Sequence, residues 1–169
     1  MKRVGSSAFA TPNTALTIAR GLGFSAGQFD LVGPSKWRSI YDAILDRFAK
    51  GGAKDARRVV WLWEFLKDEA WYRPRENEPL EVLEGFGDPE TRVFLLLEHF
   101  RVQDGERPLW LFRGSLRATL RTLEELPFTE FTITPTSMEW LVIENHHDLW
   151  IAVGEGADRV VGGERVPPL

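Results

Sequence analysis

The chain has 169 residues and a formal net charge of −4, and 43% of its residues are hydrophobic, with seven tryptophans and eleven phenylalanines. This length suits one domain with a substantial core, and this composition excludes a disordered chain. The chain has no cysteine, which excludes a disulfide, a thiol nucleophile, an iron–sulfur cluster and a four-cysteine zinc site.

The charge is distributed unevenly along the chain. Residues 1–58 carry ten Lys or Arg and four Asp or Glu, whereas residues 59–169 carry eleven basic and twenty-one acidic residues. We expect the basic part to dock on the acidic remainder of the same fold, and the alternative is a steering surface for an anionic partner. The overall acidity and the lack of a basic–aromatic motif argue against nucleic-acid binding. No apolar run approaches the roughly 20 residues that span a bilayer, and the first residues do not form a secretory signal.

The first half of the chain is predicted to contain two helices. Asn13 is a suitable N-cap for a short helix that ends before Gly21. A longer helix begins at Pro34 and Ser35 and ends at Gly51-Gly52. One apolar stripe runs along it at helical spacing, formed by Trp37, Ile40, Tyr41, Ile44, Leu45 and Phe48. Such a stripe must pack against a sheet or against another helix.

The middle of the chain is harder to assign. Arg57–Phe65 is rich in β-branched and aromatic residues, which favours a strand. Lys67–Glu78 is charged and contains Pro74, so we predict a loop there. Trp71 and Tyr72 lie in this predicted loop and are our candidate interface residues, which we expect to be exposed.

The second half is predicted to contain mainly strands. The predicted elements are a short helix at Glu78–Glu84, strands at Arg92–Phe100 and Pro108–Phe112, an amphipathic helix from Ser115 to Pro127, and a half-buried strand at Thr129–Thr134. Glu139–Gly154 follows, and it is too long for a single strand, so it must fold back at its polar break. We predict a hairpin with a two-residue loop, His146-His147, in which Val142 faces Ile151. Both of its faces are apolar, which places it inside the sheet.

These elements predict the α+β class and a single domain over residues 1–169, with flexible ends at 1–12 and 156–169. We expect a mainly antiparallel sheet of five to six strands, packed against the N-terminal helices and one inserted amphipathic helix. Short connections between the last strands favour antiparallel neighbours.

The polar break of the hairpin is the candidate functional site. Its residues are Glu144, Asn145, His146, His147 and Asp148, which include two of the three histidines. Histidine carries protons near neutral pH and binds metals, so a metal or acid–base site is one interpretation. Adjacent residues of an extended strand point to opposite faces, however, so the spacing is poor for a shared metal. The other interpretation is that Asn145 and Asp148 supply turn hydrogen bonds, although two histidines are an unusual centre for a tight hairpin. We assign no catalytic residue, metal ligand or cofactor.

The segment Trp140-Leu-Val-Ile-Glu-Asn-His-His-Asp resembles an uncharacterised family of small bacterial proteins, and the likeness covers about residues 109–154. That family pairs such a hairpin with a preceding helix that ends at a proline. The resemblance implies a bacterial, cytoplasmic protein and no activity that can be transferred. We therefore expect a non-enzymatic binding module with a protein partner, such as an immunity or accessory protein. The alternative is a metal-assisted or acid–base hydrolase-like enzyme with its site at Glu144–Asp148. The oligomeric state and the partner do not follow from the sequence.

Overall fold

The computed structural model describes residues 12–56, 62–75, 80–98, 109–127 and 130–166. Its helices are α1 (Pro12–Gly21), α2 (Pro34–Phe48), α3 (Gly52–Ala56), α4 (Leu116–Glu125) and α5 (Ala157–Val160), with 3₁₀ helices η1 (Leu62–Phe65) and η2 (Leu80–Phe86). Its strands are β1 (Phe29–Leu31), β2 (Ala70–Pro74), β3 (Arg92–Glu98), β4 (Leu109–Ser115), β5 (Phe131–Pro135), β6 (Trp140–Glu144), β7 (Leu149–Gly154) and β8 (Glu164–Val166). No helix among these residues is long and apolar enough to cross a membrane.

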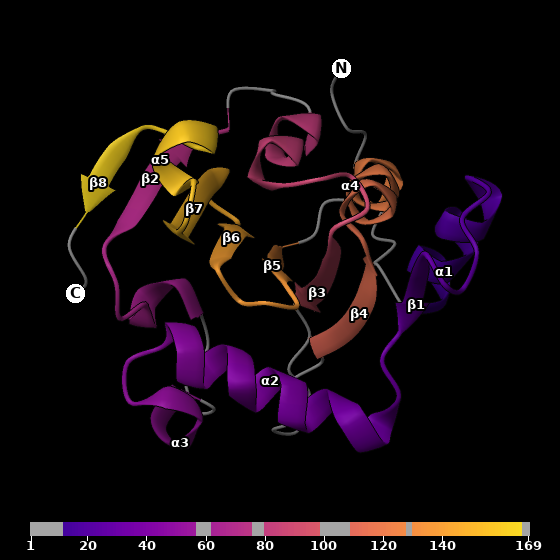
Figure 1. Ribbon diagram of the computed structural model, residues 1–169, viewed down its shortest axis with the longest axis horizontal. Helices are drawn as coiled ribbons and strands as arrows, with labels where there is room; N and C mark the ends of the chain where they lie inside the picture. Colours follow the sequence, from indigo (N-terminus) through magenta and orange to yellow (C-terminus); the bar gives the residue numbers. More distant parts are fainter. Residues whose placement is uncertain (1–11, 57–61, 76–79, 99–108, 128–129, 167–169) are drawn as a thin grey trace.

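All eight strands form one antiparallel sheet in the order β1-β4-β3-β5-β6-β7-β2-β8. The predicted α+β class is confirmed, but the prediction of five to six strands was too low. Helices cover both faces of the sheet, with α4 and α5 on one side and α2 and α3 on the other (Figure 1). We call these sides the α4 face and the α2 face.

Each face has its own hydrophobic cluster. On the α4 face, α1, η2, α4 and α5 pack against alternate residues of the central strands, such as Leu95, Val142 and Trp150. On the α2 face, α2, α3 and η1 pack against the intervening residues, such as Leu96 and Ile143. Because both faces are covered, β5 and β6 are buried at every position. This corrects the prediction of a half-buried strand at β5 and agrees with the internal position that we predicted for the hairpin.

The two amphipathic helices form where their spacing predicts them. α2 spans Pro34–Phe48, and Ile44, Leu45 and Phe48 are fully buried at its C-terminal end. α4 begins after Ser115, whose hydroxyl oxygen accepts a hydrogen bond from the Ala118 N–H at 3.3 Å. These caps and stripes are local signals, which explains the agreement.

Two predictions in the middle of the chain were wrong. The predicted loop Lys67–Glu78 contains strand β2, which lies between β7 and β8. Pro74 is tolerated because it is the last residue of the strand, and the charge of Arg73 is accommodated over the Trp150 ring at 5.2 Å. The described part of the predicted strand Arg57–Phe65 is the 3₁₀ helix η1, and residues 57–61 lie outside the described residues.

Two short strands were not predicted at all. β1 pairs with β4 at one edge of the sheet, and β8 pairs with β2 at the other edge. The predicted flexible end at 156–169 therefore contains α5 and β8, while residues 167–169 lie outside the described residues. Three-residue strands carry too little alternation to be recognised without their partners.

Candidate functional site

The candidate site lies at the loop between β6 and β7, which are adjacent antiparallel strands as predicted. Their register differs by one residue from the prediction, because Val142 pairs with Ala152 rather than with Ile151. The loop therefore has three residues, 146–148, and not the predicted two. Its last residue, Asp148, has φ 53°, and its N–H donates to the Asn145 carbonyl at 3.1 Å. Three-residue hairpin loops commonly end in this left-handed conformation, which aspartate adopts more readily than most residues.

Asn145 holds the loop together from inside. Its side chain is fully buried, and its Oδ1 accepts hydrogen bonds from the N–H groups of His147 at 3.0 Å and Leu149 at 3.2 Å. This is the turn chemistry that we expected, although it comes from Asn145 and not from the carboxylate of Asp148. The Nδ2 group of Asn145 is buried and has no hydrogen-bond partner among the described residues.

Glu144 lies on the α4 face of the sheet. It pairs across strands with Phe131 and Trp150, and both of these belong to the α4-face cluster. Its Oε1 lies 2.5 Å from Arg75 Nη1, and its Oε2 accepts a hydrogen bond from Trp150 Nε1 at 3.2 Å. The Glu144 side chain is only 3% exposed, so its charge is compensated inside the protein by Arg75.

The histidines lie toward the α2 face. One carboxylate oxygen of Glu130 accepts a hydrogen bond from the His146 backbone N–H at 2.9 Å and also contacts the ring Nδ1 of His146. The Trp63 ring, which packs on the α2-face cluster, lies 6.3 Å from the His146 ring and 6.0 Å from the His147 ring. The two imidazole rings are 4.0 Å apart. The sheet thus divides the predicted site, with Glu144 on one side and the histidines on the other.

This arrangement orients one imidazole and leaves the tip of the loop accessible. A carboxylate accepts hydrogen bonds when it is ionised, and in that state it pairs with the imidazole tautomer that carries its proton on Nδ1 and has Nε2 as the acceptor. The His146 side chain is 29% exposed, and His147 and Asp148 are exposed. Within the described ranges, no three or more His, Cys, Asp or Glu side chains form a group that could hold a metal ion.

The two candidate interface residues, Trp71 and Tyr72, are half-buried on β2 and do not lie in an exposed loop. Trp71 packs against the α4-face cluster, and Tyr72 packs against the α2-face cluster. Burial raises the pKa of the Tyr72 phenol above its usual value of 10.0. Because the two side chains point to opposite faces, a single flat surface does not include both.

Three residues that contact the hairpin were not predicted from the sequence, namely Glu130, Arg75 and Trp63. Each lies in or beside an element whose position depends on long-range contacts. Phe131 pairs with Glu144, so the preceding residue, Glu130, lies opposite Asn145 just before β5 begins. The Arg75 N–H similarly donates to the Asp148 carbonyl at 2.7 Å, one position beyond the β2–β7 ladder. Only the strand order could have revealed these partners.

A family model described as a family of unknown function, DUF6756, matches residues 13–163. The chain belongs to the DUF6756 family. The matched DUF6756 region contains the whole hairpin and all three residues that hold it, and it extends well beyond residues 109–154, where we noted the resemblance to an uncharacterised family. Comparison with curated proteins and with solved structures gives no match. The DUF6756 description assigns no activity, so the function must be argued from the site.

Proposed function

We propose that this protein is a non-enzymatic binding module that contacts a protein partner through the β6–β7 loop. One observation carries the proposal. The buried polar groups Glu130 and Asn145 are engaged with the backbone of the loop, while His147 and Asp148 at its tip face solvent. The hydrogen bonds of Glu130 and Asn145 thus fix the backbone conformation of the loop.

A loop fixed in this way is suited to recognition. Ordering the backbone of a flexible residue costs roughly 1–2 kcal/mol, and a loop that is already ordered does not incur that cost on binding. Glu130 anchors the first loop residue, His146, through its N–H. Asn145 anchors the N–H groups of His147 and Leu149, so the middle and the end of the loop are held as well.

The surface around the loop has a suitable composition for a protein partner. Trp63 lies beside both imidazole rings, and Phe65, on the same 3₁₀ helix, is 37% exposed. Aromatic groups are enriched in protein interfaces, and His147 and Asp148 add polar groups that could fix the orientation of a partner. An immunity or accessory protein acts by binding a protein partner and covering part of its surface, and this is the kind of binding module that we expect from the sequence.

The test uses the product of an adjacent gene as the candidate partner, with both proteins purified. His147→Ala combined with Asp148→Gly removes both exposed side chains of the tip and keeps the left-handed conformation accessible. Glu155→Ala, at the opposite end of the hairpin, is the control because Glu155 is also exposed. We expect calorimetry to give a dissociation constant about ten-fold or more higher for the tip variant, which corresponds to about 1.4 kcal/mol, and no change for the control. Equal affinity of the tip variant and the wild type, at unchanged thermal stability, would rule out the loop as the contact surface.

A second function is supported by the Glu130–His146 pair, because a carboxylate that orients an imidazole is a recurrent general-base arrangement. In that case the protein is a hydrolase-like enzyme, and His146 Nε2 takes the proton of the nucleophile. Turnover of model esters or phosphodiesters that disappears in Glu130→Gln and His146→Gln, both folded, would favour this function over binding. Stoichiometric zinc in the purified protein would favour its metal-assisted form.

A further inference from the structure

A second polar feature lies near the β1 edge of the sheet, where β1, β4 and β3 meet the first turns of α2. A cleft of about 250 Å³ opens there, and its lining includes Lys36, Arg92, Arg113 and Asp30. None of these residues belongs to the hairpin site, and any function of the cleft is independent of the proposal above.

The cleft exists because α2 meets different surfaces along its length. Its last turn packs on apolar residues of the sheet, whereas Trp37 and Ile40 in its first turns are only partly buried. Asp30 pairs with Arg113, and Arg113 pairs with Phe94 of the α2-face cluster, so the two charged side chains belong to the same face. Polar side chains thus replace apolar ones on this part of the α2 face. The helix α2 runs across this side of the sheet, below β1 and β4 in the view of Figure 1.

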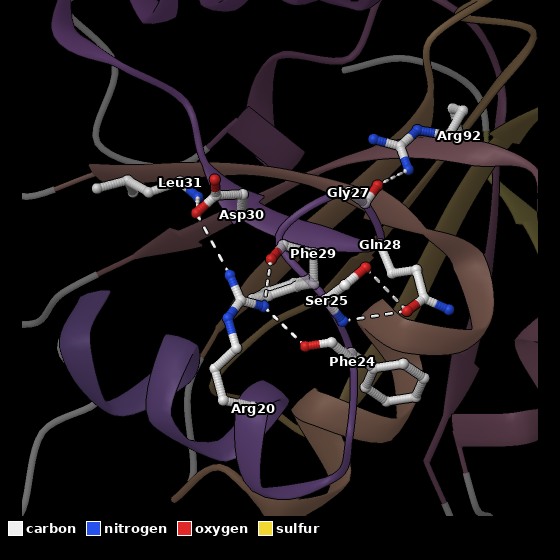
Figure 2. Close-up of polar contacts among 9 residues, drawn as sticks. All are labelled: Arg20, Phe24, Ser25, Gly27, Gln28, Phe29, Asp30, Leu31 and Arg92. Atoms are coloured by element: carbon white, nitrogen blue, oxygen red, sulfur yellow. Dashed lines mark hydrogen bonds and ion pairs between the residues drawn. The ribbon is translucent and has the colours of Figure 1, made fainter.

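One wall of the cleft is preformed by hydrogen bonds in the loop between α1 and β1 (Figure 2). Arg20 Nη1 donates to the carbonyl oxygens of Phe24 at 3.0 Å and Phe29 at 2.9 Å. Arg92 Nη1 donates to the Gly27 carbonyl at 2.6 Å, which ties the end of β3 to this loop. Gly27 lines the cleft, so its position is fixed before any ligand arrives.

The charges that line the cleft do not balance. Three cations, Lys36, Arg92 and Arg113, face one carboxylate, Asp30. That carboxylate already lies 3.7 Å from Arg20 Nη2 and accepts a hydrogen bond from the Leu31 N–H. Lys36 and Arg113 form no ion pair with any residue that the structure describes. Arg92 has no ion pair among the described residues either, but its guanidinium already donates to the Gly27 carbonyl. Lys36 and Arg113 therefore remain as two uncompensated cations that line the same cleft.

We propose that this cleft binds a phosphomonoester group, held by Lys36 and Arg113 with Arg92 as a fixed neighbour. A phosphomonoester carries about −1.5 to −2 charges at neutral pH, which matches the two uncompensated cations. Arginine binds phosphate oxygens with its planar fork, and lysine contributes a compact point charge. Typical ligand pockets measure about 300–1,000 Å³, so this smaller cleft suits a small phosphorylated molecule or a single phosphorylated side chain.

The experiment titrates the full chain with inorganic phosphate, free phosphoserine and a phosphoserine peptide at constant ionic strength. We expect saturable binding of all three in calorimetry, with dissociation constants of about 1 mM or lower. Stronger binding of the peptide than of free phosphoserine would identify a modified protein as the source of the group. Binding of free phosphoserine at least as strong as that of the peptide would identify a small metabolite.

Charge-removing variants decide whether the cleft is the site. Lys36→Ala and Arg113→Ala should each weaken phosphate binding by about ten-fold, the scale of a lost hydrogen bond to a charged group. Lys54→Ala and Arg117→Ala remove exposed charges outside the cleft and should leave the affinity unchanged. All four positions are exposed, so we expect every variant to unfold at nearly the wild-type temperature, and Arg113→Lys should recover part of the affinity. Absence of saturation, or equal weakening by the Lys54 and Arg117 variants, would overturn the proposal.

Discussion

Glu130 and His146 lie 16 positions apart, yet one oxygen of the Glu130 carboxylate contacts both the backbone N–H and the ring Nδ1 of His146. The carboxylate is almost fully buried, whereas the imidazole is partly exposed. This pair joins the start of β5 to the hairpin loop, so the conformation of the loop depends on a residue outside the hairpin.

Removing the Glu130 carboxylate should loosen the hairpin. Glu130→Ala leaves the His146 N–H without its acceptor, and a lost hydrogen bond to a charged group costs about 1.5–3 kcal/mol. We expect a decrease of this size in the free energy of unfolding measured with urea. Glu139→Ala, which removes an exposed glutamate at the start of β6, should change stability by less than about 0.5 kcal/mol. If Glu130→Ala were as stable as this control, the Glu130 carboxylate would not stabilise the hairpin loop.

The Arg75–Glu144 pair should behave as a coupled buried ion pair. Arg75→Met alone removes the cation that lies 2.5 Å from the buried Glu144 carboxylate, which costs about 3–5 kcal/mol. Arg75→Met combined with Glu144→Leu removes both charges and should be more stable than Arg75→Met alone. A thermodynamic cycle from urea unfolding measures this coupling. If the two single losses simply add in the double variant, the charges are not coupled.

The stability of Asp148 variants should depend on whether the new residue can adopt the left-handed backbone conformation, and not on its charge. The Asp148 φ of 53° lies in the left-handed region, which glycine adopts freely. We expect Asp148→Gly to retain stability within about 0.5 kcal/mol, the range of surface substitutions. Asp148→Val should lose about 1–2 kcal/mol, because a β-branched residue is penalised in the left-handed region, whereas the short polar side chain of aspartate is tolerated there. Equal thermal unfolding of the two variants would show that the loop relaxes to another conformation.

Ile44 tests the packing of α2 on the sheet. It is fully buried in the α2-face cluster, and Ile44→Ala should cost about 2–5 kcal/mol. Ser39→Ala on the exposed side of the same helix is the matched control. A loss below about 0.5 kcal/mol for Ile44→Ala would argue against this packing.

The burial of Tyr72 should make the free energy of unfolding decrease at alkaline pH. Burial raises the pKa of its phenol above 10.0 in the fold, so the folded state favours the neutral form. The resulting stabilisation is complete below pH 10 and is lost as the pH rises above that value through the folded pKa. The chain has only two tyrosines. Comparing the ultraviolet titration of the wild type with that of Tyr72→Phe therefore isolates the ionisation of Tyr72, which should occur at the higher pH. Tyr72→Phe should lose less stability than the wild type above pH 10, and identical pH profiles would count against this assignment.

The sequence predicted those elements whose signals are local. α2 and α4 follow from apolar spacing, from Pro34 as the first residue of α2 and from the N-cap Ser115 of α4. The hairpin follows from the length of Glu139–Gly154, since no ordinary strand is that long. Its register could not be predicted, because a loop of two residues and a loop of three residues fit the same polar break until Asp148 is known to be left-handed.

The elements that were missed depend on partners distant in the chain. β2 contains arginine and proline and is recognisable as a strand only when Trp150 lies beneath Arg73 and when β7 and β8 flank it. The same limit applies to the candidate site. The five residues Glu144–Asp148 were identified by composition, but Glu130 and Arg75, which balance them, reach the hairpin only through the order of the strands.

The position of β2 in the sheet has a consequence for how the chain assembles during synthesis. β2 is synthesised well before both of its neighbours, β7 and β8, and Pro74 pairs with Leu149. Until residues 149–154 have left the ribosome, the backbone hydrogen-bonding groups of Ala70–Pro74 have neither of their native strands to bond. Exposed strands of this kind are prone to pair with other molecules. Completion of the sheet therefore waits for the last strands, and an interrupted chain that ends before Leu149 would carry an open β2 prone to self-association.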